Sequence, residues 1–388
     1  MKKLIRITTV PLSLDKLLEG QLQFMQHHYQ VTAISSEEAY LKKIGKREGV
    51  ATYPLEMTRK ITPFRDAWAI VQLTYYFLKN KPAIVHSHTP KAGLVAMTAA
   101  FLARVPIRLH TVAGLPLMET QGFKRTILEW VDRMTYAFAT HVYPNSKGLE
   151  KIMLDNRYCS PKKMKVLAKG SSNGINTDYF SKTTLSSASL QQLQVDLHLS
   201  PNDFVFVFVG RLVADKGINE LVTAFDQLVQ SQNSPAERPC KLVLVGPLEP
   251  ELDPLDASTL KLIETHPDII SVGYQSDVRP YFALAHALAF PSYREGFPNV
   301  VMQAGAMELP VIATDINGCN EIILPGTNGL LIPTKDAKAL HNAMQLLVTD
   351  VSLYQHLKSN ARKSITERYN QQVVWEAILE EYKHLEGF

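Results

Sequence analysis

Short apolar runs alternate with amphipathic stretches along nearly the whole chain, and this alternation constrains the fold more than any other feature. Seven strand-like runs occupy the first half, from Leu4–Val10 to Lys165–Leu167. Six more follow, from Phe204–Val209 to Leu330–Ile332. Strands that alternate with helices at this spacing favour parallel sheets covered by helices. We therefore predict an α/β protein with two doubly wound domains.

A serine- and threonine-rich stretch after Phe180, SKTTLSSASLQQLQ, separates the two series and predicts a linker. With 388 residues, the chain is also too long for one ordinary core. We predict domains at 1–180 and 181–370, followed by a helical segment at 371–388. Because ligands bind at the carboxyl ends of parallel strands, we expect a shared site in the cleft between the two domains.

Composition is typical of a soluble globular protein, with 46% hydrophobic and 20% charged residues. The first apolar run is broken by Arg6 and indicates a strand, not a signal peptide. The run Ala92–Ala103 is too short to span a bilayer. The three cysteines form neither a metal-ligand spacing nor a disulfide framework, which fits a reducing cytosol.

Charge is distributed unevenly along the chain. Residues 1–180 hold 26 Lys and Arg against 13 Asp and Glu, a net +13, and the remainder is −9. A basic first half favours an anionic partner, either a membrane surface or a phosphate-bearing acceptor. A basic domain without such a partner is the alternative. Nucleic acid is disfavoured because the cations are scattered and do not gather with aromatic residues on one element.

The stretch 288–303, LAFPSYREGFPNVVMQ, combines a strand, a glycine turn and a helix start. Leu288–Pro291 predicts a buried strand, and a helix begins near Asn299 with Pro298 in its first turn. Backbone N–H groups at such a helix start bind anions. Glu295 stands just before the helix and Gln303 lies two turns inside it. The alternative is an ordinary strand–turn–helix crossover with a surface glutamate.

A second cationic loop follows the first strand of the second domain. Arg211 and Lys216 lie in the segment VGRLVADKG, where glycines let the chain bend sharply. Arginine binds phosphate oxygens in a bidentate manner and lysine acts as a mobile point charge, so the two cations suit a diphosphate. A salt-bridged surface loop is the alternative. We find no Asp-x-Asp segment to hold a metal and predict none.

These segments resemble the retaining glycosyltransferases of family 4, above all the bacterial enzymes that extend lipid-linked surface polysaccharides. The resemblance rests on REGFPNVV, PVIATDINGCNEII, GSSNGIN and TTVPLSLDKLLEGQL, and it covers nearly the whole chain. It implies the GT-B fold, in which two Rossmann-like domains face each other and the last helix crosses back to the N-terminal domain. It also implies an N-terminal acceptor-binding domain and a C-terminal nucleotide-sugar-binding domain.

The implied reaction is metal-independent transfer of a sugar, with retention, from a nucleotide diphosphate sugar to a hydroxyl. The expected donor is a UDP-sugar, and no cofactor is expected. The expected acceptor is a glycan or a polyprenyl-diphosphate-linked sugar in capsule, O-antigen or exopolysaccharide synthesis. The cysteine pattern and the basic first half predict a cytoplasmic location at the inner face of the cell membrane. We find no carboxylate suited to act as a nucleophile. The resemblance implies a same-face displacement, in which the leaving phosphate takes the acceptor proton.

The resemblance also implies roles for single residues. His110, whose alternative is a hydrogen-bonded core histidine, is expected to be catalytic together with Glu295, Arg211 and Lys216. His88 and Lys91 are expected on the acceptor side. The expected donor-binding residues are Gly20, Arg211, Lys216, Tyr274, Glu295, Gly296, Phe297, Pro298, Asn299, Val300 and Gln303.

Gln303 departs from the family pattern, which has a second glutamate at this position that grips the ribose hydroxyls. An amide offers one acceptor and one donor face where a carboxylate accepts from both hydroxyls, so we expect nucleotide binding that is retained but weaker. Two alternatives stay open: a non-catalytic partner of another glycosyltransferase, and a nucleotide-sugar hydrolase or epimerase on the same fold.

Overall fold

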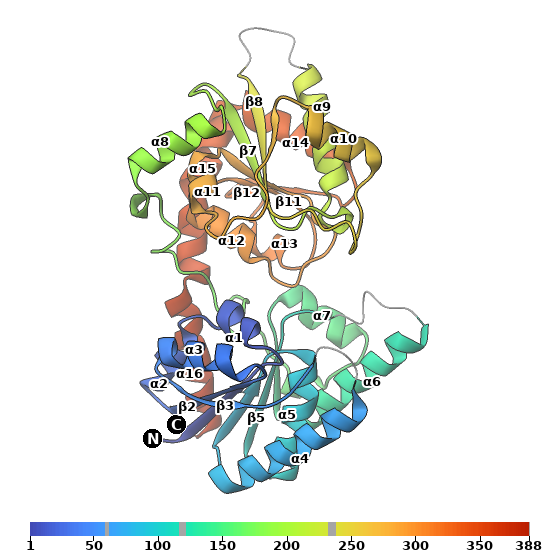
Figure 1. Ribbon diagram of the computed structural model, residues 1–388, viewed down its shortest axis with the longest axis vertical. Coiled ribbons are helices and arrows are strands. Elements are labelled where there is room, and N and C mark those ends of the chain that lie inside the picture. The colour runs from blue at the N-terminus through green and yellow to red at the C-terminus, as the bar shows by residue number, and fades with distance from the viewer. Residues whose placement is uncertain (59–61, 116–121, 232–237, 388) are drawn as a thin grey trace. The chain divides into compact units, whose positions relative to one another are not determined.

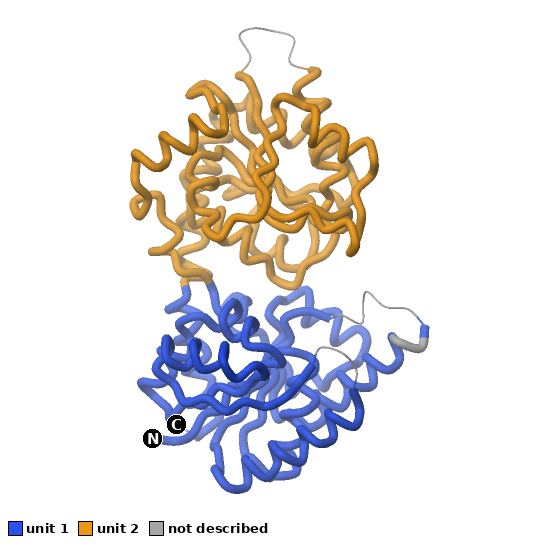
Figure 2. Tube along the Cα trace, in the orientation of Figure 1, with its two compact units in different colours: residues 1–174, 371–388 blue, residues 175–370 orange. Residues whose placement is uncertain are grey.

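The computed structural model describes residues 1–58, 62–115, 122–231 and 238–387, and the chain divides into two compact units. Unit 1 contains residues 1–174 and 371–388, and unit 2 contains residues 175–370 (Figure 2). The break between the units therefore follows Gly174, where the sequence predicts one after Phe180. The last helix, α16 (Gln371–Leu385), belongs to unit 1.

Unit 1 is built on a six-stranded parallel sheet with the strand order β3-β2-β1-β4-β5-β6. The strand order reverses between β1 and β4, so the carboxyl ends of these two strands form a topological switch point. The strands are β1 (Lys3–Ile7), β2 (Gln30–Ser35), β3 (Ala51–Pro54), β4 (Ile84–Ser87), β5 (Ile107–Val112) and β6 (His141–Pro144).

The prediction of a strand at Lys165–Leu167 is wrong. Val142 of β6 pairs with Met164 in one isolated bridge, and the backbone N–H of Lys165 donates to the Val142 carbonyl, but no ladder follows. Val166 and Leu167 are nevertheless buried. Their burial explains the apolar pattern without a strand.

Helices cover both faces of this sheet (Figure 1). Leu4 and Ala33 pack on the side of α1–α3 and α16, whereas Ile5 and Ile34 pack on the side of α4–α6, as the alternation of side chains along a strand requires. The helices are α1 (Pro11–Leu17), α2 (Gln21–Gln26), α3 (Glu38–Glu48), α4 (Pro63–Asn80), α5 (Pro90–Leu102), α6 (Gly122–Phe138), α7 (Lys147–Asp155) and α16.

Buried polar contacts fasten α16 to the sheet. The hydroxyl of the fully buried Tyr382 accepts a hydrogen bond from Nη1 of Arg6 at 2.8 Å and lies 2.5 Å from Nδ1 of His86. The carboxylate of Glu381 accepts from the hydroxyl of Tyr143 at 3.1 Å and from Nζ of Lys165 at 2.5 Å. The last helix is therefore an integral layer of unit 1.

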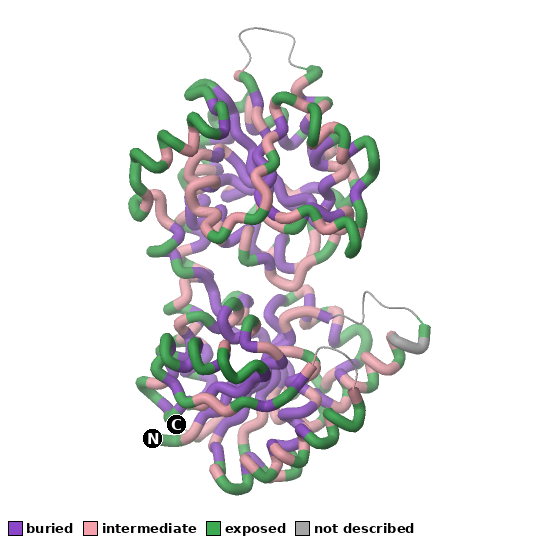
Figure 3. Tube along the Cα trace, in the orientation of Figure 1, coloured by how far each residue is buried: buried purple, intermediate pink, exposed green. Residues whose placement is uncertain are grey.

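Unit 2 repeats this architecture around a second six-stranded parallel sheet, ordered β12-β11-β10-β7-β8-β9. Its central strand β7, FVFVFV, is almost wholly buried, as a strand covered by helices on both sides must be (Figure 3). The strands are β7 (Phe204–Val209), β8 (Cys240–Val245), β9 (Ile269–Ser271), β10 (Ala287–Phe290), β11 (Val311–Thr314) and β12 (Gly329–Ile332).

The predicted serine-rich linker contains a helix, so that prediction is wrong. Ser186 caps α8 by accepting from the backbone N–H of Ser189. Serine is favoured at a helix cap for this reason, and here it signals a helix start. The helices of unit 2 are α8 (Ser187–Asp196), α9 (Ile218–Ser231), α10 (Ala257–Thr265), α11 (Arg279–Leu284), α12 (Asn299–Ala306), α13 (Cys319–Ile322), α14 (Ala337–Thr349) and α15 (Val351–Tyr369).

Candidate active site

In unit 2, an ion pair joins two loops at the carboxyl edge of the sheet. Lys216 ends the short 3-10 helix η4 (Ala214–Lys216) after β7, and Glu295 lies in the loop after the neighbouring strand β10. Nζ of Lys216 is 2.5 Å from Oε1 of Glu295, which also accepts from the hydroxyl of Ser292 at 3.0 Å. The two charged side chains are only 16% and 17% exposed. The structure thus brings together two residues that the sequence predicts for one site.

Close backbone approaches fix this site. Gly217 has a φ of +71°, and a Cβ there would collide with the carbonyl of Pro291. Gly318 has a φ of +77°, and its Cβ would come within 2.6 Å of the Gly296 carbonyl oxygen. The side-chain amide of Asn317 donates to that same oxygen at 2.8 Å. The loop that carries Glu295 is therefore held by its neighbours.

The helix α12 begins directly after this loop, as predicted. Pro298 is buried at its N-cap and Phe297 packs against Tyr369, with ring centroids 5.4 Å apart. These two residues anchor the turn, whereas Asn299 is exposed at the helix start. The first N–H groups of a helix have no intrahelical partner and are available to an anion.

Gln303 lies on α12 and is half-buried. Its side-chain amide makes no hydrogen bond to another residue in the part of the chain that the structure describes. Val300, one turn earlier on α12, is also half-buried and packs against the core. The amide of Gln303 is therefore free to bind a ligand.

Arg211 and Tyr274 are more exposed than the ion pair. Nη1 of Arg211 lies 3.5 Å from Oε2 of Glu249, and its side chain is 45% exposed. An ion pair this exposed is weak, so the guanidinium can exchange its partner for a phosphate at little cost. Tyr274 follows β9 and is 73% exposed. Both side chains are accessible to a ligand.

In unit 1, a cavity of about 210 Å³ lies at the carboxyl end of β5. It is lined by His88 and His110, two of the predicted site residues, and by Thr111, Asp132 and Tyr136 among others. Lys91, which the sequence predicts beside His88, forms an ion pair with Asp66 of α4 instead.

His110 is held as a neutral imidazole in this cavity. Its Nδ1 lies 2.8 Å from the Oγ of Ser87, and burial lowers the pKa of His110 to about 4. Gly93 of α5 makes room for the ring, since a Cβ there would come within 2.5 Å of Cε1. With Nδ1 engaged, the other nitrogen of His110 remains for a ligand.

His88 and Asp132 are buried in the same cavity without polar partners. His88 is 4% exposed, and neither of its ring nitrogens bonds to a described residue. Its ring lies against that of His86, tilted by 32°, with centroids 4.2 Å apart. Asp132 of α6 is 7% exposed, and no described residue donates to its carboxylate. Burial raises the pKa of Asp132 to about 7. Buried polar groups are almost always hydrogen-bonded, so these two point to a ligand or to water.

Sequence reasoning missed Asp132. It shares a helix face with Thr135 and Tyr136, both nearly fully buried. An acidic residue on the buried face of an amphipathic helix is the signal that would have found it.

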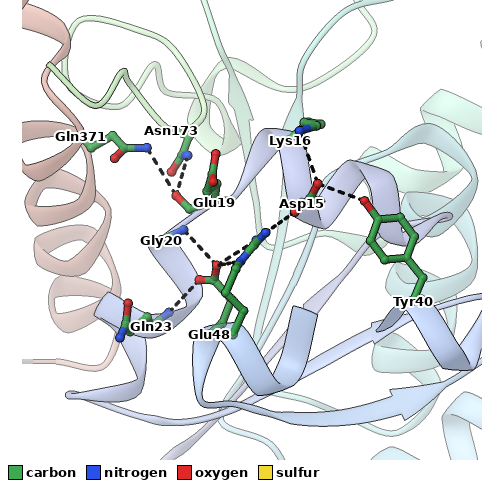
Figure 4. A network of polar contacts seen from close by, with 10 residues as sticks. Asp15, Lys16, Glu19, Gly20, Gln23, Tyr40, Glu48, Asn173 and Gln371 are labelled. Atoms are coloured by element: carbon green, nitrogen blue, oxygen red, sulfur yellow. Dashed lines mark hydrogen bonds and ion pairs between the residues drawn. The ribbon is translucent and has the colours of Figure 1, made fainter. Parts of the chain in front are cut away.

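Gly20 has a structural neighbour that the sequence does not reveal. Gly20 does not lie in the turn that directly follows β1, because α1 comes between them. Gly20 caps α2 with a φ of +74°, and its N–H donates to Glu48 at 3.2 Å (Figure 4). A Cβ on Gly20 would come within 2.8 Å of the Trp375 ring of α16. Close packing on Trp375 accounts for the glycine, and its donor-binding role stays a prediction.

Both units of this chain are similar to those of known glycosyltransferases. Residues 191–364 match the family described as Glycosyl transferases group 1, and residues 23–170 match the Glycosyl transferase 4-like domain. The chain is 32% identical to the capsular polysaccharide biosynthesis glycosyltransferase CapM of Staphylococcus aureus, over 97% of this chain and 96% of CapM.

Two further proteins are less similar in sequence. The UDP-Gal:alpha-D-GlcNAc-diphosphoundecaprenol alpha-1,3-galactosyltransferase of Escherichia coli is 25% identical over 81% of this chain and 78% of its own length. Among solved structures, Anabaena Alr3699/HepE in complex with UDP and glucose superposes with a TM-score of 0.79 at 17% identity. That alignment covers 99% of this chain and all of HepE, and it shows a shared fold.

Proposed function

This chain belongs to the group 1, family 4 glycosyl transferases, and from that premise we propose that it moves a sugar from a UDP-sugar to a hydroxyl of a polyprenyl-diphosphate-linked glycan, with retention. The names of similar proteins support the donor and the acceptor in this proposal. CapM is named for capsular polysaccharide synthesis, and the Escherichia coli relative is named for a UDP-sugar donor and a diphosphoundecaprenol-linked acceptor. The HepE complex contains UDP.

The observation that carries the proposal is the Lys216–Glu295 pair beside the start of α12. A diphosphate bound at the helix start would draw on Lys216, on the exposed guanidinium of Arg211 and on free backbone N–H groups. Negative charge grows on the leaving diphosphate as the sugar departs. Cations that strengthen their hold at that moment lower the barrier.

We propose that Glu295 binds sugar hydroxyls and does not attack the anomeric carbon. Its carboxylate is neutralised by Lys216 and accepts a hydrogen bond from Ser292, both of which weaken a nucleophile. In the same-face displacement, the bond from the anomeric carbon to the phosphate oxygen breaks and the bond to the acceptor oxygen forms. The acceptor proton passes to the departing phosphate oxygen, so no base is needed.

We assign the acceptor sugar to the cavity of unit 1. His88 and Asp132 would hydrogen-bond its hydroxyls, because both lack polar partners among the described residues. His110 would add its second nitrogen from the same wall. Lys91 receives less support, since its ammonium is already paired with Asp66.

We propose a cytoplasmic location at the inner face of the cell membrane, where a polyprenyl-linked acceptor would be anchored. Cys159, Cys240 and Cys319 are all free thiols, which fits a reducing compartment. The basic charge of the first half fits an acceptor that carries a diphosphate.

The test is product analysis with a panel of UDP-, GDP- and ADP-sugars and an undecaprenyl-diphosphate-linked sugar. We expect one UDP-sugar to extend the acceptor and Arg211→Ala to reduce transfer about 100-fold or more. Lys338→Ala, which removes an exposed cation from α14, is the matched control. Hydrolysis that persists unchanged when acceptor is present, or epimerised donor as the product, would contradict the proposal.

A further inference from the structure

The helix α4 exposes a continuous apolar face. Five large side chains on it are more than half exposed: Phe64 (93%), Trp68 (62%), Val71 (56%), Tyr75 (70%) and Leu78 (54%). They recur every three or four residues, which places them on one side of the helix. The stripe therefore runs along nearly the whole helix.

The opposite side of α4 is apolar as well. Ala69, Leu73 and Phe77 are buried against the core of unit 1. A surface helix of a soluble domain normally turns a polar face outward. The helix α4 instead buries one apolar face against unit 1 and exposes a second one. Exposed apolar patches of this kind mark interaction surfaces.

Exposed charges beside the stripe are positive. Arg65 stands at one end, Lys79 and Lys81 stand at the other, and the single acid of the helix, Asp66, is paired with Lys91. Unit 1 as a whole holds 27 Lys and Arg against 16 Asp and Glu, a net +11. Aromatic residues on an apolar face with basic flanks are the composition of a helix that lies in the interface of an anionic membrane.

The start of α4 lies beside the cavity of unit 1. The Asp66–Lys91 ion pair joins the first turn of α4 to the first turn of α5. Thr89 and Pro90, immediately before Lys91, line that cavity. Phe64 and Trp68 therefore stand at the sheet edge where we place the acceptor sugar.

We propose that the outward face of α4 docks unit 1 on an anionic membrane surface. This inference rests on the proposed function for the acceptor, whose lipid tail would lie in the same membrane. No helix among the described residues is long and apolar enough to cross a membrane. In the proposed attachment, α4 therefore lies on the membrane surface. A second copy of the chain fits this face less well, because symmetric pairing would bring the basic flanks of two copies together.

The experiment is co-sedimentation of the full chain with vesicles of phosphatidylcholine alone or mixed with phosphatidylglycerol. Val71→Glu places a charge in the stripe, and Val195→Glu makes the same change on α8 of unit 2, where Val195 is 66% exposed. We expect wild type to bind the anionic vesicles, with binding falling as salt rises. Val71→Glu should lose about tenfold or more in affinity, and Val195→Glu should bind as wild type does.

Two results would overturn the inference. One is equal vesicle binding by the Val71→Glu and Val195→Glu variants. The other is a concentration-dependent dimer of wild type that Val71→Glu abolishes, since this would assign the face to a second copy. Vesicle binding needs no catalysis, so a wild type that binds but transfers no sugar would leave this inference standing and refute the proposed reaction. Transfer to a water-soluble, short-chain acceptor should be unchanged in Val71→Glu.

Discussion

Lys216 and Glu295 are 79 residues apart in the sequence, yet Nζ of the lysine lies 2.5 Å from Oε1 of the glutamate. Their loops follow the adjacent strands β7 and β10, so the order of the sheet brings them together. The pair neutralises both charges in the free protein. A donor diphosphate must therefore compete with Glu295 for the lysine. Before the donor arrives, the ion pair with Glu295 keeps the cation in place.

Replacement of Lys216 by methionine tests this relationship. We expect Lys216→Met to lower kcat/KM for the donor about 100-fold or more, because the cation that supports the leaving group is lost. It should also lower the free energy of unfolding by about 1–3 kcal/mol, because Glu295 loses its charge partner in a mostly buried place. Steady-state kinetics and urea unfolding measure the two effects.

The double variant Lys216→Met/Glu295→Gln separates the effect on activity from the effect on stability. It should recover much of the stability, since no unpaired charge is left, and none of the activity. Recovery of activity together with stability would show that the pair has only a structural role.

Gln303→Glu tests the departure from the family pattern. Hydrogen bonds to a charged group are roughly twice as strong as neutral ones, so we expect the variant to bind UDP about five- to tenfold more tightly. Gln303→Leu, which keeps the apolar stem and removes the amide, should bind more weakly than wild type. Isothermal titration calorimetry measures all three. No UDP binding by wild type, with binding created by Gln303→Glu, would favour a non-catalytic partner subunit.

Much of the fold follows from local sequence patterns. The central strand β7 is a run of alternating Phe and Val, and burial between two helical layers is what such a run requires. The loop with Glu295 and the start of α12 were also predictable, because a strand, a glycine turn and a helix start follow one another within sixteen residues. These features depend on neighbours in the chain.

What could not be predicted depends on residues far apart in the sequence. Asp132 stands out in the sequence only as an acid on the buried face of an amphipathic helix, and the cavity that it lines forms only when β5 and the start of α5 pack beside that helix. Gly20 looks like a ligand-binding glycine, but Trp375 of the last helix is what lies against it. The helix α8 was hidden because its serines suit both a cap and a linker.

Asp132 should make stability depend on pH. Burial raises its folded-state pKa to about 7 from the usual value of 3.8, so between these pH values the folded chain holds a proton that the unfolded chain has released. Stability therefore falls as pH rises from about 4 to 7. Asp132→Asn removes this loss and should exceed wild type by about 2–4 kcal/mol at pH 8, with the difference shrinking toward pH 4. Urea unfolding at both pH values measures it.

Asp155→Asn, an exposed acid at the end of α7, should show no such pH-dependent gain. Activity gives the second readout for Asp132. If its carboxylate binds an acceptor hydroxyl, Asp132→Asn raises KM for the acceptor and leaves donor hydrolysis unchanged. A gain in stability with unaltered acceptor KM would remove Asp132 from the acceptor site.

Gly20→Ala tests the contact that joins the first turns of unit 1 to its last helix. Gly20 and Gly49 both have a positive φ, +74° and +68°, so alanine strains the backbone at either position. Only at Gly20 does the new methyl group meet another side chain, the ring of Trp375, whereas nothing lies within 4 Å at Gly49. We expect Gly20→Ala to lower the free energy of unfolding by about 1–3 kcal/mol more than Gly49→Ala, the cost of overpacking. In a Trp375→Ala background the two substitutions should cost the same, and a difference that survives there would place the constraint elsewhere.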